Sequence, residues 1–174
     1  MPLNVGYLSA KTDKKSDETY TPAIAVEPLL EYIKTSKVVW CPFDIEGQSK
    51  YLEVFKNAGI KTIASHIDTG QNFFEYEPDE PYDYIISNPP FSIKDMILKR
   101  LDELGKPYAM LLPLPTLQGQ KRFQYLKDCQ ALIFNKRINY YRDKEMKNVQ
   151  PGVSFASIYI CKNFLPEKLI FKEL

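Results

Sequence analysis

Short apolar runs alternate with amphipathic stretches along most of this chain, and this alternation limits the folds it can adopt more than any other feature. Strand-like runs are expected at residues 38–41, 61–65, 82–87, 108–112, 131–134 and 155–161. Apolar residues at helical spacing predict helices at residues 49–58, 92–104 and 118–128. Strands that alternate with helices predict an α/β fold, a doubly wound, mainly parallel sheet with helices on both faces.

The N-terminal part of the chain has a different character. Residues 9–19 are polar and charged without periodicity, so we expect residues 1–18 to form a polar arm and residues 19–174 to form a single domain. A helix is expected to follow Thr21-Pro22, because apolar residues then recur at helical spacing. Pro28 either kinks this helix or marks its true start.

Scarce residue types exclude several kinds of site. The three cysteines, Cys41, Cys129 and Cys161, are widely separated, which predicts reduced thiols and no disulfide framework. His66 is the only histidine, so no metal site is expected. The seven glycines contain neither GxG nor GxxxxGK, which removes the main support for a dinucleotide or phosphate-loop site. No long apolar run and no secretory signal are visible, so we expect a cytoplasmic protein that does not contact membranes.

The loops after three predicted strands are the places where a ligand site is expected. In open α/β sheets, ligands bind at the carboxyl ends of the strands, near the point where the strand order reverses. These loops follow Cys41, Ser65 and Ser87. The third begins with Asn88-Pro89-Pro90-Phe91, directly before a predicted helix. An ordinary Asn-Pro turn with a hydrophobic anchor is the alternative interpretation of this tetrapeptide.

The tetrapeptide at this position resembles the [DNS]PP[YFW] signature of class I methyltransferases that use S-adenosyl-L-methionine (AdoMet) to modify exocyclic amines. We expect the Rossmann-like fold of that family, and the 6-amino group of adenine is the substrate of the members that this chain resembles most, the phage-type DNA methyltransferases. An adenine 6-amino nitrogen is a poor nucleophile, because its lone pair is shared with the ring. A catalyst must therefore hold both amine hydrogens so that the lone pair points at the methyl donor.

Each residue of the tetrapeptide has an expected catalytic role. The Asn88 side-chain oxygen and the Pro89 carbonyl can accept the two amine hydrogens, and Pro90 helps to fix the direction of that carbonyl. Asn88 takes no proton at neutral pH, so it orients the amine and stabilises developing charge. Phe91 would stack on the base. The base must be flipped out of a duplex or presented on a single strand.

Further segments resemble the parts of these enzymes that bind AdoMet. The resemblance implies cofactor contacts from Tyr20 and Thr21 in the Thr19-Tyr20-Thr21-Pro22 segment, although a plain helix cap explains this segment as well. Pro42 and Asp44 occupy the place of the family's cofactor loop, without its paired glycines. Asp44 alternatively caps the following helix.

The next strand and its loop carry three more expected cofactor contacts. Asp68 stands nearest to the place of the family's ribose-binding acid, with His66 as the alternative. Asn72 lies in a Gly-Gln-Asn-Phe-Phe segment that resembles the part of the family that reads the adenine end of AdoMet. Residues 137–140 and 151–157 also resemble segments of phage-encoded adenine methyltransferases.

A basic segment is expected to contact the substrate. Residues 118–150 hold eight cations and three acids, a local charge of +5 in a chain whose net charge is +1. A solvated surface is the alternative interpretation. The DNA contacts expected from this segment are Lys121, Arg122, Arg137, Tyr140 and Arg142. The segment is short for a dedicated recognition domain, so sequence specificity is either low or supplied by formation of a homodimer.

The function expected from the sequence is methyl transfer from AdoMet to the 6-amino group of adenine in DNA. Two other readings stay open. Methyltransferases that act on ribosomal guanine or protein glutamine use the same tetrapeptide, because their substrates are also planar amines. A catalytically silent protein on the same fold, which binds nucleic acid or a protein partner, would explain the missing glycines of the cofactor loop.

Overall fold

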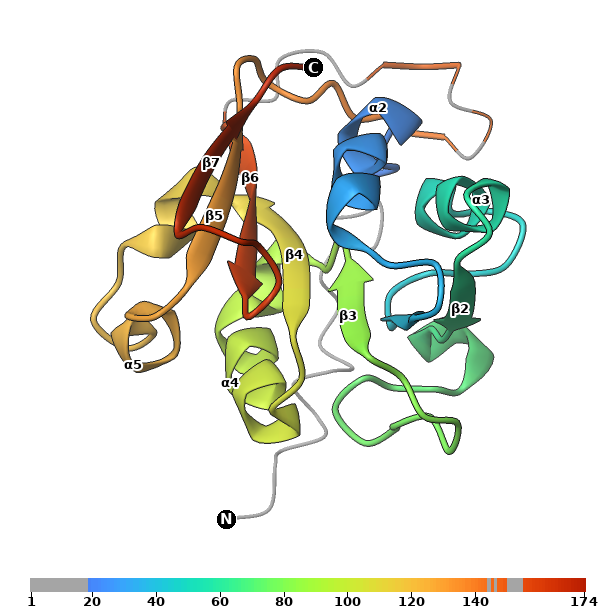
Figure 1. Cartoon of the computed structure of the whole chain (residues 1–174), viewed down its shortest axis with the longest axis horizontal. Coiled ribbons are helices and arrows are strands. Elements are labelled where there is room, and N and C mark those ends of the chain that lie inside the picture. Colours follow the sequence, from blue (N-terminus) through green and yellow to red (C-terminus); the bar gives the residue numbers. More distant parts are fainter. Residues whose placement is uncertain (1–18, 144, 146, 150–154) are drawn as a thin grey trace.

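The computed structural model describes residues 19–143, 145, 147–149 and 155–174 (Figure 1). The predicted arm at residues 1–18 and part of the segment at 151–157 lie outside the described residues. The strands are β1 (Val38–Cys41), β2 (Lys61–Ala64), β3 (Tyr84–Ser87), β4 (Tyr108–Pro113), β5 (Gln130–Phe134), β6 (Ser157–Lys162) and β7 (Leu169–Lys172). The α-helices are α2 (Ala23–Val26), α3 (Lys50–Asn57), α4 (Lys94–Leu104) and α5 (Phe123–Leu126). Short 3-10 helices are η2 (Glu27–Tyr32), η3 (Ile67–Thr69), η4 (Phe91–Ile93) and η5 (Leu114–Leu117).

The strands form one seven-stranded sheet in the order β2-β1-β3-β4-β6-β5-β7. The pairs β1–β2, β1–β3, β3–β4 and β5–β7 are parallel, whereas β6 runs antiparallel to both β4 and β5. The predicted α/β class with a mainly parallel sheet is therefore confirmed. The order reverses between β1 and β3, so the loops after these two strands lie side by side.

Alternate residues of the strands pack on opposite faces of the sheet. In β1, Val39 and Cys41 belong to a core with α2, η2 and α3, whereas Trp40 belongs to a second core with α4 and α5. The central strand β4 is buried along most of its length and contributes to both cores. Burial on both faces explains why the strands read as continuous apolar runs. The expectation of helices on both faces is confirmed.

Two predicted helices differ from the observed elements. Pro28 has no N–H to donate, and the helix that begins at Ala23 continues from Glu27 as a 3-10 helix. The helix expected at residues 118–128 is reduced to α5. A continuous helix would pair the carbonyl of Gln118 with the amide of Arg122, but this carbonyl accepts from the Arg122 guanidinium at 3.4 Å.

Other features of the described chain bear on the sequence expectations. The three cysteines are free, as predicted, and burial raises the pKa of the Cys41 and Cys161 thiols. The last strand, β7, was not expected from the sequence; it pairs only with β5 and forms one edge of the sheet. Within the described ranges, no helix is long and apolar enough to cross a membrane.

Candidate active site

The side-chain oxygen of Asn88 lies at the reversal point of the sheet, and no described residue donates a hydrogen bond to it. Asn88 directly follows β3, and its Nδ2 donates to Oγ1 of Thr21 at 3.0 Å. Its Oδ1 is buried and has no hydrogen-bond partner among the described residues. Leaving a buried acceptor unpaired costs about 1–3 kcal/mol. Such an atom therefore points to a group that arrives from outside the chain, and an N–H donor meets this need.

The rest of the tetrapeptide is held in a defined conformation. Pro89 is buried, and Pro90 has φ −58° and ψ 126°, an extended conformation that ends where η4 begins. The ring of Phe91 meets the ring of Phe155 edge to face, with centroids 5.4 Å apart and an angle of 85°. Sequence reasoning gave Phe155 no role of its own, because the contact joins segments that are distant along the chain.

The carboxylate of Asp44 connects the two loops at the reversal point. It accepts hydrogen bonds from the hydroxyls of Ser49 and Ser87, and Ser87 immediately precedes Asn88. Ser49 is also the N-cap of α3 and accepts from the amide of Tyr51 at 3.1 Å. Burial raises the pKa of Asp44 to about 6, although both serine hydrogen bonds favour the charged form. Asp44 thus supports the cap of α3 through Ser49 and does not cap the helix itself.

The N-terminal segment contacts the tetrapeptide although the two are 67 positions apart in the sequence. Thr21 is buried beside Asn88, and the backbone of Tyr20 pairs with that of Tyr141 through bonds of 2.9 and 3.0 Å. Tyr141 in turn pairs with Val149. The loop that carries Arg142 is therefore fastened to the same edge of the sheet as Asn88.

The end of β2 carries the other expected cofactor residues. Trp40 Nε1 donates to Ser65 Oγ at 2.8 Å, which fastens this end to β1. His66 Nδ1 accepts from the amide of Asp68 at 3.0 Å, so the neutral ring keeps its proton on Nε2 and can donate to a ligand. The Asp68 side chain is exposed, while Asn72 Oδ1 accepts from the amide of Phe74 at 3.2 Å. These groups can bind hydroxyls, as a ribose would require.

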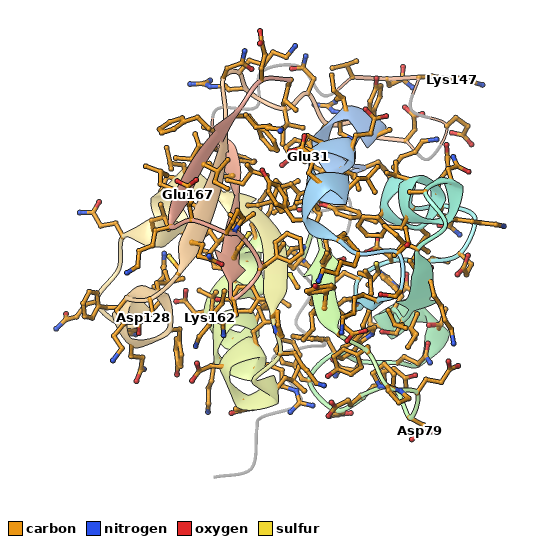
Figure 2. The ribbon with its side chains drawn as sticks, viewed as in Figure 1. Glu31, Asp79, Asp128, Lys147, Lys162 and Glu167 are labelled. Atoms are coloured by element: carbon orange, nitrogen blue, oxygen red, sulfur yellow. The ribbon has the colours of Figure 1, made fainter. Side chains whose placement is uncertain are left out.

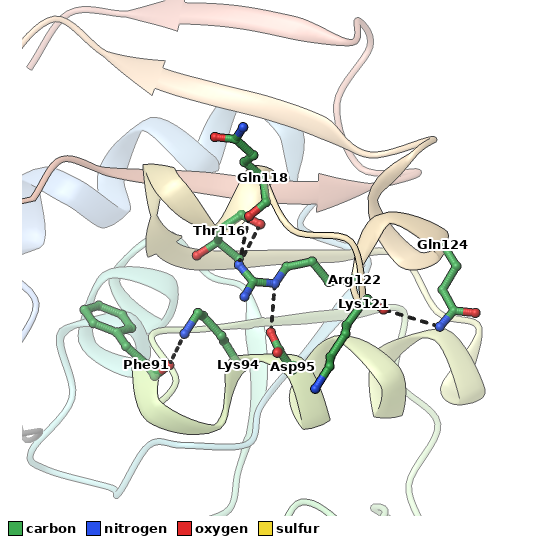
Figure 3. A network of polar contacts seen from close by, with 8 residues as sticks. All are labelled: Phe91, Lys94, Asp95, Thr116, Gln118, Lys121, Arg122 and Gln124. Atoms are coloured by element: carbon green, nitrogen blue, oxygen red, sulfur yellow. Dashed lines mark hydrogen bonds and ion pairs between the residues drawn. The ribbon is translucent and has the colours of Figure 1, made fainter.

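The structure corrects two of the expected substrate contacts. The Arg122 guanidinium forms an ion pair with Asp95 at 2.8 Å and donates to the carbonyl of Thr116 at 3.3 Å (Figure 3). Tyr140 is only 1% exposed, and its hydroxyl donates to Ser157 at 2.7 Å. Arg122 is thus already bound within the chain, and Tyr140 is a core residue. Neither side chain is available to bind a nucleic-acid strand at the protein surface.

The other expected contacts are exposed but lie in two places. Lys121 belongs to the loop between η5 and α5, whereas Arg137 and Arg142 follow β5. Figure 2 shows the separation of the basic segment, with Asp128 near α5 and Lys147 at the far end of the view beyond α2. Asp143 shapes the second part, because its carboxylate accepts from the amides of Lys147 and Asn148 at 2.9 and 2.8 Å. Those bonds lower the pKa of Asp143.

No metal site was expected from the sequence. Across the described ranges, no group of three or more histidine, cysteine, aspartate or glutamate residues lies close enough together to hold a metal ion. The residues gathered around Asn88 are hydroxyls, an amide, a carboxylate and aromatic rings. This set is suited to an organic ligand that carries N–H and O–H groups.

Comparisons with known proteins find little similarity in sequence. No family model matches the chain, and no curated protein matches it. Among solved structures, a dimethyladenosine transferase from Plasmodium falciparum is similar, with a TM-score of 0.46 and 11% sequence identity. The similarity covers 86% of this chain and 63% of that chain, so this protein spans less than two thirds of the length of the transferase.

Proposed function

We propose that this protein transfers a methyl group from AdoMet to the 6-amino nitrogen of an adenine in DNA. The observation that carries the proposal is the buried, unpaired Oδ1 of Asn88 at the reversal point of the sheet. When bound, AdoMet supplies an electrophilic methyl group. The residues of the chain then have to present an amine nitrogen with its lone pair free.

Asn88 and Pro89 are suited to hold that amine. The Asn88 side-chain oxygen accepts one amine hydrogen and the Pro89 carbonyl accepts the other. The bond from Asn88 Nδ2 to Thr21 keeps the amide from rotating, so its oxygen stays directed at the substrate. As the nitrogen attacks, positive charge develops on it, and both oxygens stabilise this charge until the nitrogen releases one proton to solvent. Phe91, braced by Phe155, supports the ring of the base.

The groups around this position also fit AdoMet. The acceptor at Asn88 that no described residue pairs with lies next to the loop after β1, at the reversal point where ligands of such sheets bind. His66 Nε2, the exposed carboxylate of Asp68 and the amide of Asn72 offer partners for ribose and adenine. Tyr20, Thr21, Pro42 and Asp44 complete the proposed cofactor contacts.

AdoMet is expected to raise the melting temperature of the purified protein. A ligand that binds only the folded state stabilises it by about 2.7 kcal/mol at a hundred times its Kd, which corresponds to several degrees for a domain of this size. Differential scanning fluorimetry with AdoMet, and with its demethylated product, measures the shift. ATP serves as a control for non-specific binding of an adenine nucleotide. A result in which AdoMet changes neither the melting temperature nor the heat measured by calorimetry would favour the alternative hypothesis, a catalytically silent protein on the same fold.

Exposed cations of the basic segment are proposed to hold the DNA backbone. Replacing Lys121, Arg137 and Arg142 together by alanine is expected to weaken DNA binding and to reduce its salt dependence, because each lost phosphate contact removes about 0.7–0.9 from the slope of log K against log salt. Fluorescence anisotropy across a salt series provides the measurement. Lys61→Ala is the matched control, since Lys61 lies at the opposite, amino end of β2 and pairs with Glu80. An unchanged slope in the triple variant would assign these cations to an ordinary solvated surface.

A further inference from the structure

We infer that residues 114–127, from η5 through α5, form a binding shelf for the single-stranded nucleic acid that flanks the target adenine. This inference rests on the proposed function, since it names how the same substrate extends away from the site. The shelf was expected from the sequence to contribute cations from a longer helix. The structure presents large exposed apolar side chains there beside the cations.

Three large apolar side chains of the shelf face solvent. Leu114 is 40% exposed, Leu117 is 38% exposed and Phe123 is 66% exposed. Leu126, by contrast, is buried in the core with α4, so this residue packs the shelf onto the rest of the domain. A phenylalanine exposed to this extent gains little from the fold, and it offers a flat ring to a ligand.

The shelf adjoins the tetrapeptide through a network of polar contacts. Its first residue follows β4, the strand that neighbours β3. Arg122 crosses from the shelf to Asp95 in the first turn of α4, four positions after Phe91. The carbonyl of Phe91 accepts from Lys94 at 3.2 Å. Figure 3 shows these residues together, with Phe91 at the start of α4 and the shelf running along that helix.

The charge of the shelf favours a polyanion. Lys121 and Lys127 are exposed, and Asp95 of the neighbouring helix α4 is already paired with Arg122. Cations beside an aromatic ring and aliphatic side chains form the surface that binds single strands, where phosphates contact the cations and unpaired bases stack on the ring. A duplex keeps its bases stacked on each other and would leave Phe123 unused. The shelf therefore selects an unpaired flank.

Binding of a labelled oligodeoxythymidine that contains one adenine tests this inference. Phe123→Ala is expected to weaken binding by about tenfold or more, and Phe123→Trp is expected to retain it, because either ring can stack on a base. Phe171→Ala is the matched control: Phe171 is 70% exposed but lies on β7 at the edge of the sheet. Oligonucleotides shortened from one end or the other should show that the effect of Phe123→Ala disappears when one particular flank is missing.

The outcomes separate this inference from the proposed function. Wild-type affinity in Phe123→Ala, or equal losses in Phe123→Ala and Phe171→Ala, would overturn the shelf even if the protein methylates adenine. A change from dimer to monomer in Phe123→Ala, measured by light scattering, would make the shelf a protein interface and also overturn it. If the wild-type protein transfers no methyl group but binds single strands through Phe123, the proposed function fails and the shelf stands.

Discussion

Replacing Asn88 by alanine is expected to lower methyl transfer to adenine by about 10²-fold or more while leaving the affinity for AdoMet nearly unchanged. The Asn88 oxygen gains most of its value as positive charge develops on the attacking nitrogen, so its loss affects turnover more than binding. The amide also donates to Thr21, which is buried but lies outside the sheet. The fold should therefore tolerate the change.

Transfer of a tritiated methyl group from AdoMet to unmethylated DNA, followed by nucleoside analysis, measures this effect. Asn88→Asp keeps an acceptor at the same position and should retain more activity than Asn88→Ala. Asn57→Ala, an exposed substitution at the end of α3, is the matched control and should behave as the wild type. Wild-type turnover in Asn88→Ala would contradict the proposed role. Methylated guanine, methylated glutamine in protein, or methylation of RNA alone would reassign the substrate.

Local patterns were sufficient to predict most of the sheet. The apolar runs that became β1, β3 and β4 are bounded by turn residues and buried on both faces, which makes a run conspicuous in the sequence. Gly59 and Gly105 end helices with φ of 72° and 63°, as glycine permits. Because parallel strands bring their carboxyl ends to one edge, the neighbourhood of the loops after β1 and β3 could also be predicted.

Contacts between distant segments could not be predicted from these patterns. The hydrogen bond from Ser87 to Asp44 joins residues that are 43 positions apart, and no periodicity signals it. In the sequence, Arg122 is indistinguishable from the other cations of the basic segment. Only the position of Asp95 on a neighbouring helix places it in an ion pair within the chain. Tyr140 follows charged residues, yet Ser157 satisfies its hydroxyl in the core. For Arg122 and Tyr140, the charged neighbours in the sequence suggest an exposed side chain, whereas contacts with distant segments bind both side chains within the fold.

Replacing Asp44 by asparagine is expected to stabilise the fold relative to the wild type as the pH rises from about 4 to about 7. Burial raises the pKa of Asp44 from 3.8 to about 6 in the folded protein. Between these two values the folded state binds more protons than the unfolded state, so the contribution of Asp44 to stability falls as the pH rises. Above pH 6 the charged carboxylate costs about 3 kcal/mol, from about two pKa units at 1.36 kcal/mol each. Asparagine carries no charge at any of these pH values.

Urea unfolding of both proteins across this pH range measures the difference. Asp83 and Asp143 have lowered pKa values, so their contributions change in the opposite direction with pH, but they are common to both proteins and cancel. Asp68→Asn, at an exposed carboxylate, is the matched control and should leave the pH profile close to that of the wild type. A constant difference between Asp44→Asn and the wild type would mean that the carboxylate is not desolvated. A difference that grows with pH would show that the buried carboxylate of Asp44 destabilises the fold when it is charged.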